Sequence, residues 1–239
     1  MAAKKILVVD DEKEITDLLE VYLKNEGYEV YKFYKAEGVI DCILNNNIDL
    51  AVLDVMLPDA DGFMLCKEIR KEWYFPVIML TAKVEYMDKI TGITMGADDY
   101  IIKPFNPLEV VARVKAQLRR AGDYNKSIEK ADTENAGNEE GYYNVRGLEL
   151  FEDEHRCLLY GEEIMLTPIE FSIILYFIKN IDKVVSSEEL FENVWGEKYL
   201  NSNNTVMAHI ARIRDKLHEN SRQPKFIKTV WGVGYKIET

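Results

Sequence analysis

The sequence predicts an α/β domain with a five-stranded parallel sheet, followed by a smaller α+β domain. Three observations support this. Short apolar runs alternate with helical periodicity in the first half. A polar, acidic stretch at 122–141 breaks the pattern, and short strand-like pieces, three helical segments and two closing strands follow it. A chain of 239 residues is long enough for two ordinary domains.

In the first domain, the strands are predicted as apolar runs at 5–9, 28–33, 49–54, 76–81 and 99–102. The segments between them place apolar residues three and four apart, as Ile15, Leu18 and Leu19 do. Strands that alternate with helices pair in parallel through right-handed crossovers. Nearly continuous apolar strands are typical of burial on both faces, so we expect a doubly wound sheet.

Residues 122–141 contain one isolated apolar side chain, Ile128, among acidic and polar residues. Such a stretch buries too little surface to compensate for its loss of conformational entropy. We therefore expect a first domain at 1–121, a flexible linker at 122–141 and a second domain at 142–239.

The second domain begins with short strand-like pieces over 143–166. Thr167 followed by Pro168 and Glu170 predicts a capped helix start, and Ser187 is the expected cap of the next helix. A third helix is predicted from about Asn204 to Leu217. The final "FIKTVWGVGYKIE" predicts a hairpin of two strands.

The composition favours a cytoplasmic protein without a membrane segment. No apolar run approaches the ~20 residues that a transmembrane helix needs. The three cysteines have neither disulfide nor zinc spacing, so we expect reduced thiols. The net charge of −12 argues against a nucleic-acid partner, but residues 204–236 contain more Lys and Arg than Asp and Glu. A solvated helix face could also give this local excess.

Polar side chains stand where the predicted strands end. Asp10 and Asp11 follow the first strand and Asp54 ends the third, while Thr81 and Lys103 end the fourth and fifth. The carboxyl ends of parallel strands share one edge of a sheet. A single aspartate there is more simply an ordinary strand end, but carboxylates together with a hydroxyl and an ammonium favour a phosphoryl-transfer site that holds Mg²⁺.

The ordered motifs "VVDDE", "LDVMLPDADG", "MLTA" and "GADDYIIKPF" resemble the receiver domain of two-component response regulators over residues 1–121. The resemblance implies a flavodoxin-like fold in which Asp54 accepts a phosphoryl group from a sensor histidine kinase. It also implies Mg²⁺ ligation by Asp11, Asp54 and the Met56 carbonyl, with Asp10 acting through water.

The same resemblance implies that Thr81 bonds the phosphoryl oxygens, that Lys103 pairs with them, and that Tyr100 turns inward as Thr81 moves. Lys103–Pro104 is expected to be a cis peptide, since X–Pro bonds lose little by being cis. Phosphorylation is expected to pair two receivers through a charged face. That face contains Lys89, Asp98, Asp99, Glu109, Arg113 and Arg120.

In "NNTVMAHIARIRDKLHE", one apolar stripe contains Val206, Ile210 and Ile213, and the other faces are small, polar or basic. Such a helix suits a DNA major groove, although an exposed surface helix is an alternative. With the preceding helix and the hairpin, residues 145–238 resemble the winged helix-turn-helix effector of the OmpR/PhoB family. The expected DNA-binding residues are Asn204, Thr205, Met207, Ala208, Ala211, Arg212, Arg214, Lys216, Lys228 and Trp231.

Two positions depart from the family, which often has arginine where this chain has Ala211 and Trp231. The first change removes a base or phosphate contact, so we expect Arg212 and Arg214 to supply the direct contacts. Trp231 cannot offer a guanidinium to a narrow minor groove. We expect its ring to pack against the wing, which is the predicted hairpin around "TVWGVGYKI", or against a sugar edge of the DNA.

These features predict a phosphorylation-activated transcription regulator and not an enzyme. Its partners would be the kinase, promoter DNA and a second copy of the chain, and the resemblance also allows RNA polymerase. Aspartyl-phosphate phosphohydrolases have a second aspartate two residues after the nucleophile, where this chain has Met56. An alternative is a receiver that acts by protein contacts alone with a degenerate effector, but the basic helix and the wing argue against it.

Overall fold

The computed structural model describes residues 3–82, 96–131, 141–196, 199, 203–220 and 223–239. The chain divides into two compact units, Met1–Arg119 and Arg120–Thr239. No helix among the described residues is both long and apolar enough to cross a membrane.

The first unit contains a five-stranded sheet in the order β2-β1-β3-β4-β5, and every strand pair in it is parallel. The predicted α/β sheet is therefore confirmed. The strands are β1 (Lys5–Val9), β2 (Glu29–Phe33), β3 (Leu50–Asp54), β4 (Val77–Thr81) and β5 (Asp99–Ile102).

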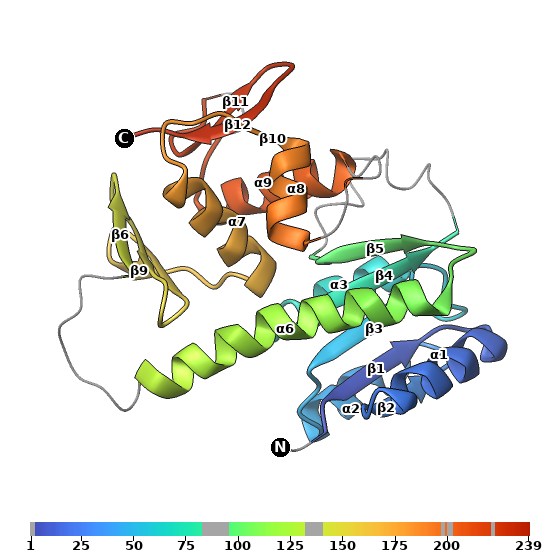
Figure 1. Cartoon of the computed structure of the whole chain (residues 1–239). Helices are drawn as coiled ribbons and strands as arrows, with labels where there is room; N and C mark the ends of the chain where they lie inside the picture. Colours follow the sequence, from blue (N-terminus) through green and yellow to red (C-terminus); the bar gives the residue numbers. More distant parts are fainter. Residues whose placement is uncertain (1–2, 83–95, 132–140, 197–198, 200–202, 221–222) are drawn as a thin grey trace. The chain divides into compact units, whose positions relative to one another are not determined.

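Helices cover both faces of this sheet (Figure 1). On one face, Ile6 and Val8 of β1 share a core with Leu19 of α1 (Lys13–Asn25) and Val110 of α6 (Pro107–Ala131). On the other face, Leu7 and Val9 share a core with residues of α2 (Val39–Asn45) and α3 (Gly62–Ile69). Because neighbouring strand residues point to opposite faces, the apolar residues 6–9 of β1 contribute to both cores, and the sheet is doubly wound.

Helix α6 continues through residues 122–131, the first part of the expected linker. Extending an existing helix adds a hydrogen bond per residue without a new nucleation step. The polar sequence therefore continues the helix although it could not start one alone. Residues 132–140 of the expected linker lie outside the described residues.

The second unit has the predicted α+β order (Figure 1). A four-stranded antiparallel sheet comes first, three helices follow, and the last two strands pair with β10 in a three-stranded sheet. The elements are β6 (Tyr142–Val145), β7 (Leu148–Phe151), β8 (Arg156–Leu159), β9 (Glu162–Glu163), α7 (Pro168–Lys179), β10 (Val185–Ser186), α8 (Ser187–Trp195), α9 (Asn203–Lys216), β11 (Ile227–Val230) and β12 (Gly234–Ile237).

The helix starts follow local capping chemistry. Thr167 and Glu170 form the predicted capping box of α7, with Pro168 at its first turn. Helix α8 is capped by Ser186 and not by Ser187, because the Ser186 hydroxyl accepts a hydrogen bond from Glu189 N at 3.0 Å. The spacing of three residues from serine to glutamate is the capping-box spacing, which places the cap one residue earlier than expected.

None of the three cysteines, all of which are among the described residues, forms a disulfide, as their spacing predicted. Cys42 is half-buried, whereas Cys66 and Cys157 are buried. The buried thiols belong to the apolar cores of the first and the second unit, respectively. They therefore act as small packing residues in these cores.

Candidate functional site

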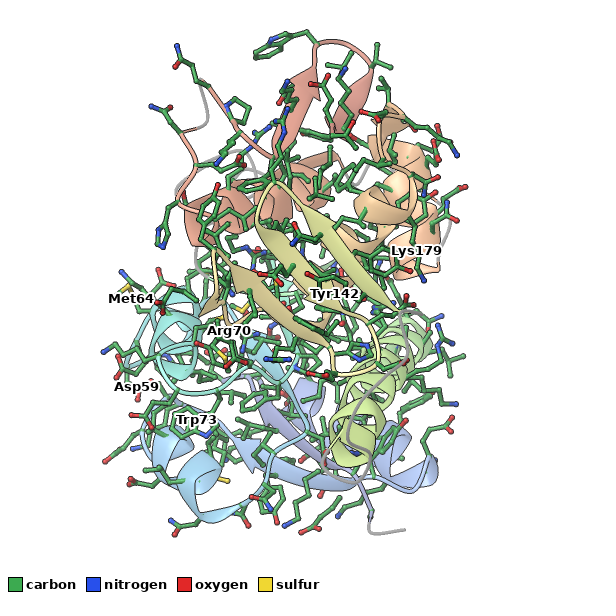
Figure 2. The ribbon with its side chains drawn as sticks, turned by 90° about the vertical axis from the view of Figure 1, so that its left-hand side faces the viewer. Asp59, Met64, Arg70, Trp73, Tyr142 and Lys179 are labelled. Carbon is green, nitrogen blue, oxygen red and sulfur yellow. The ribbon has the colours of Figure 1, made fainter. Side chains whose placement is uncertain are left out.

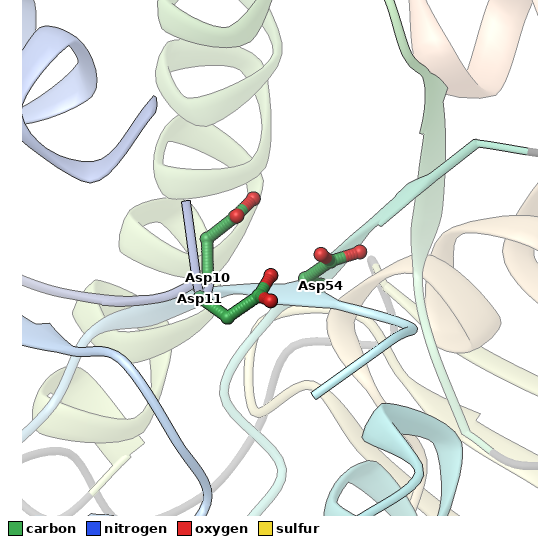
Figure 3. Close-up of side chains that lie close together, drawn as sticks. All are labelled: Asp10, Asp11 and Asp54. Carbon is green, nitrogen blue, oxygen red and sulfur yellow. The ribbon is translucent and has the colours of Figure 1, made fainter. Parts of the chain in front are cut away.

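Three carboxylates meet at the carboxyl edge of the first sheet, as predicted. Asp10 and Asp11 follow β1 and Asp54 ends β3, and one oxygen from each lies within 4.8 Å of the others (Figure 3). Asp10 and Asp54 are buried, whereas Asp11 is exposed. The two strands are adjacent, since Val9 pairs with Leu53, so the convergence follows from the strand order.

Lys103, which follows β5, reaches into this cluster. Its Nζ lies 2.7 Å from Asp10 Oδ2 and 3.0 Å from Asp54 Oδ2. Burial alone would lower the pKa of Lys103, but hydrogen bonds to the carboxylates raise it overall. The ammonium is therefore held charged beside the proposed phosphoacceptor.

The Asp10 carboxyl has a pKa raised to about 6. Burial is the main cause, and repulsion from Asp54 adds to it, while Lys103 and the backbone N–H of Glu12 act in the opposite direction. One ammonium does not neutralise three clustered carboxylates. The cluster therefore retains an excess of negative charge for a cation.

The donor set fits Mg²⁺. Hard divalent cations prefer carboxylate, carbonyl and water oxygens, and magnesium takes few protein carboxylates. Asp11 and Asp54 offer such oxygens, Asp10 lies beside them, and Met56 stands two residues beyond Asp54 in the loop after β3. The exposure of Asp11 leaves the cluster open to solvent on that side, which gives a cation and its waters a way in.

Thr81 and Tyr100 lie on the neighbouring strands β4 and β5, and both are buried. Lys103 N donates to Thr81 O at 2.7 Å, so the backbone at the end of β4 is tied to the residue that reaches Asp54. Lys103–Pro104 is a cis peptide, which confirms the prediction.

Sequence reasoning missed Glu12, whose Oε1 lies 3.0 Å from Lys103 Nζ. Glu12 is the third acidic residue of the "VVDDE" motif and directly follows Asp10 and Asp11, which the motif assigned to the metal site. Its position next to Asp11 could have indicated that it also contacts the cluster. Glu12 therefore shares with Asp10 and Asp54 the task of holding the ammonium.

For the expected dimer face, the structure corrects the prediction at Asp98. Asp98 is fully buried, and its Oδ2 accepts from Arg70 Nη2 at 2.6 Å and from Val77 N at 2.8 Å. It lies in the loop before β5 and faces the interior, so it cannot form a surface pair. Asp99, the next residue, is also buried and accepts from Arg113 Nη1 at 2.9 Å.

Other residues of the expected face stay predictions. Glu109 accepts from Arg113 Nη2 at 3.0 Å on the surface of α6, and Arg120 lies further along the same helix. Lys89 lies outside the described residues. The pairing of Arg113 with Asp99 and Glu109 within one chain shows that these charges are already partnered without a second copy.

In α9, the structure changes the prediction for Arg214. Its guanidinium is buried and donates to Ile227 O and to Thr229 Oγ1, both on β11. The arginine lies beside the apolar stripe of α9, where the helix packs on the wing. Arg214 therefore joins the helix to the wing and does not face outward.

The remaining α9 residues differ in exposure. Met207 is exposed and Ala211 is partly exposed, whereas Thr205, Ala208 and Arg212 are buried. For Ala208 and Arg212, the expectation that they face outward, away from the apolar stripe, is not met. A helix that packs on more than one side buries residues outside its apolar stripe. Asn204 belongs to α9, but its side chain lies outside the described part of the chain. Their DNA contacts stay predictions.

Two of the basic residues that we expected to bind DNA form ion pairs within the second unit. Lys216 Nζ lies 2.6 Å from Glu170 Oε2, so it ties α9 to the capping box of α7. Lys228 of β11 pairs with Glu238. In the wing, Trp231 packs against no part of the hairpin, because it is 90% exposed, and that half of our expectation is wrong.

The first unit has an acidic pocket with a partnered lysine at the edge of a doubly wound sheet, which defines a phosphoacceptor domain. The second unit has three helices and a C-terminal hairpin, which define a winged helix-turn-helix domain. Residues 6–115 match the response regulator receiver domain, and residues 161–237 match the C-terminal domain of transcriptional regulatory proteins. The chain belongs to the OmpR/PhoB-type response regulators, in which a receiver domain is joined to a DNA-binding domain.

Two curated relatives match nearly the whole chain. The regulatory protein VanRc of Enterococcus gallinarum is 60% identical over 236 residues, which cover 99% of each chain. The regulatory protein VanR of Enterococcus faecium is 51% identical over 238 residues, which cover 98% of each chain. A solved structure of a RitR mutant shares the fold, with a TM-score of 0.71 at 24% identity over 98% of this chain and 99% of that one.

Proposed function

We propose that Asp54 of this response regulator accepts a phosphoryl group from the phosphohistidine of a sensor kinase. The observation that carries the proposal is the position of the Asp54 carboxylate, 3.0 Å from Lys103 Nζ and within reach of the Asp10 and Asp11 oxygens. An Asp54 oxygen attacks phosphorus as the bond to the histidine nitrogen breaks, and the nitrogen keeps the electron pair. The product is an acyl phosphate.

Bound Mg²⁺ would neutralise charge on the transferring phosphoryl group. Within the chain, Asp11, Asp54 and the Met56 carbonyl would hold the ion, with Asp10 acting through water. Lys103 would pair with a phosphoryl oxygen, and the Thr81 hydroxyl would donate to another. Movement of Thr81 toward the phosphoryl group, followed by Tyr100, would shift the receiver between two populated states.

The acceptor is tested by incubating the full chain with Mg²⁺ and acetyl phosphate and locating the modification by mass spectrometry. Asp54→Ala should abolish labelling. Asp41→Ala, an exposed aspartate on α2, is the control and should label as the wild type does. Labelling of Asp54→Ala at the wild-type level would show that another residue is the acceptor.

The phosphorylated chain would dimerise through the α6 face that contains Glu109, Arg113 and Arg120. Light scattering with beryllofluoride, a phosphoryl mimic, should show a doubled mass. Arg113→Glu should prevent the change, because it breaks the pairs with Asp99 and Glu109 and reverses the charge. Lys67→Glu, on exposed α3 surface, should not. A monomer with beryllofluoride, or a dimer that survives Arg113→Glu, would contradict this interface.

Two effector domains held by paired receivers would bind repeated half-sites in promoter DNA with increased effective concentration. The chain would act in the cytoplasm as a regulator and not as a phosphohydrolase, with RNA polymerase as a further partner. From its relation to the two Enterococcus proteins, we propose vancomycin-resistance or other cell-envelope genes as targets. Chromatin capture of bound genomic fragments tests this, and sites confined to unrelated genes would exclude it.

A further inference from the structure

The loop between β3 and α3 contains Met56, whose carbonyl oxygen is an expected ligand of Mg²⁺. The two ends of this loop are joined, because Gly62 N donates to Val55 O at 2.8 Å. Met56 also forms an isolated antiparallel bridge with Asp61. A Cβ at Gly62 would overlap Asp54 O, so the loop closes directly on the end of β3. The base of the loop is therefore fixed beside the proposed phosphoacceptor.

The middle of the same loop is held by an exposed side chain, Asp59, which is labelled in Figure 2. Its two carboxylate oxygens accept from two consecutive backbone N–H groups, Ala36 N at 2.8 Å and Glu37 N at 2.9 Å. These hydrogen bonds lower the pKa of Asp59, and the one from Ala36 is the main cause. A carboxylate with one N–H on each oxygen has a defined orientation, so Asp59 joins this loop to the loop between β2 and α2.

The β2–α2 loop is in turn tied to the first aspartate of the cluster. Asp10 N donates to Phe33 O at 3.1 Å, at the end of β2, and Val9 pairs with Phe33 in the sheet. At the other end of the loop, Val39 N at the start of α2 donates to Ala36 O at 3.1 Å. A short loop that is fixed at both ends has little freedom to move. Asp59 therefore connects the segment that follows β1 with the segment that follows β3, on the two sides of the metal cluster.

The metal cluster has a physical need for such a connection. Asp10, Asp11 and Asp54 repel one another, and the repulsion acts to separate the segments that carry them. Mg²⁺ accepts only near-ideal octahedral geometry with short bonds to oxygen. If the segments drift apart, part of the binding free energy is used to bring the ligands together again. A connection that exists before the ion binds removes this cost.

We propose that Asp59 is a positioning residue of the Mg²⁺ site, which holds the loop of Met56 against the β2–α2 loop so that the carbonyl is in place when the ion arrives. The inference rests on the Mg²⁺-dependent phosphoryl transfer proposed above and adds a residue that touches neither the ion nor the phosphoryl group. An exposed aspartate could instead act through its charge alone. The two hydrogen bonds to consecutive N–H groups favour a role that depends on geometry, and the two roles predict different results.

Isothermal titration calorimetry of the full chain with Mg²⁺ measures the effect. Asp59→Ala should weaken Mg²⁺ binding about 10-fold, at the low end of the loss expected when a group that orients a metal ligand is removed. Asp59→Asn keeps one acceptor oxygen and should recover part of the affinity. Glu37→Gln is the matched control, because it removes one exposed negative charge from the β2–α2 loop and keeps the backbone N–H that Asp59 binds. It should bind Mg²⁺ as the wild type does.

Two further measurements separate positioning from a general loss of structure. Amide hydrogen exchange, followed by NMR, should become faster at Ala36 and Glu37 in Asp59→Ala, because both N–H groups lose their acceptor. Labelling of Asp54 by acetyl phosphate should be slower than in the wild type at limiting Mg²⁺ and equal to it at saturating Mg²⁺. The groups that act on the phosphoryl group are unchanged, so only the Mg²⁺ concentration needed for the reaction rises.

The outcomes distinguish this inference from the function on which it rests. If the wild type binds no Mg²⁺, the metal site itself is wrong. If the wild type binds Mg²⁺ and Asp59→Ala binds it equally well, the positioning role of Asp59 is overturned. An equal loss of affinity in Asp59→Ala and Glu37→Gln would assign the effect to charge and contradict the role in positioning. Slower labelling of Asp59→Ala at saturating Mg²⁺ would contradict it as well, because Asp59 would then affect the transfer step.

Discussion

Replacing Arg214 by methionine removes a buried link between α9 and the wing. In the wild type, Arg214 Nε and Nη2 donate to Ile227 O at 3.1 and 2.6 Å, and Nη2 also donates to Thr229 Oγ1 at 2.9 Å. Its guanidinium carbon lies 5.9 Å from the ring centre of Tyr235. Burial lowers the pKa of Arg214 from its ordinary value, which shows the cost of desolvating the cation.

The size of the effect follows from these contacts. Hydrogen bonds from a charged donor contribute ~1.5–3 kcal/mol each, and a buried carbonyl left without a donor costs ~1–3 kcal/mol. Removing a buried cation recovers part of its desolvation cost. Methionine keeps most of the apolar stem, so we expect a net loss of about 2–3 kcal/mol in the free energy of unfolding of the second unit.

Urea unfolding followed by circular dichroism measures the stability, and DNA affinity against salt concentration measures the role in binding. If Arg214 positions the wing, Arg214→Met loses stability and affinity, but the salt slope stays unchanged. Met207→Ala, at an exposed position of the same helix, is the control and should keep wild-type stability. Unaltered unfolding together with a slope lower by about one would refute the reasoning and assign Arg214 to a DNA phosphate.

Three further predictions concern the two units separately. Arg70→Met removes the cation that pairs with buried Asp98 and should destabilise the first unit by ~3–5 kcal/mol (Arg70 is labelled in Figure 2). Lys71→Met, which removes an exposed pair with Glu68, should cost under ~1 kcal/mol, and urea unfolding compares the two variants. Gly234→Ala places a methyl group against Val185 O and should destabilise the second unit by more than ~1 kcal/mol. Thermal unfolding measures this loss, and wild-type stability would contradict the close approach of β12 to β10. Burial raises the pKa of the Cys157 thiol to about 12, so iodoacetamide at neutral pH should modify Cys157 only when the unit unfolds. Half-buried Cys42 should be modified faster, and mass spectrometry measures both rates; equal rates would contradict the burial of Cys157.

The sequence by itself determined the first sheet and its acidic cluster. Each apolar run that ends in a polar residue marks the carboxyl end of a strand, and parallel pairing brings such ends to one edge whatever the rest of the chain does. Asp10, Asp54, Thr81 and Lys103 were predictable for this reason. The helix starts at Thr167 and near Ser186 were likewise local, because capping depends on residues three apart.

Only the tertiary structure decided the role of side chains whose partners are distant in the sequence. Asp98 and Asp99 are adjacent and identical in type, yet Asp98 is held inside by Arg70 and Asp99 by Arg113 on α6. Arg214 and Trp231 were both predicted DNA contacts, but one lies buried against β11 and the other stands in solvent. Charge and hydrogen-bonding capacity are properties of a residue, whereas burial depends on which surfaces meet when the chain folds, and no local pattern contains that information.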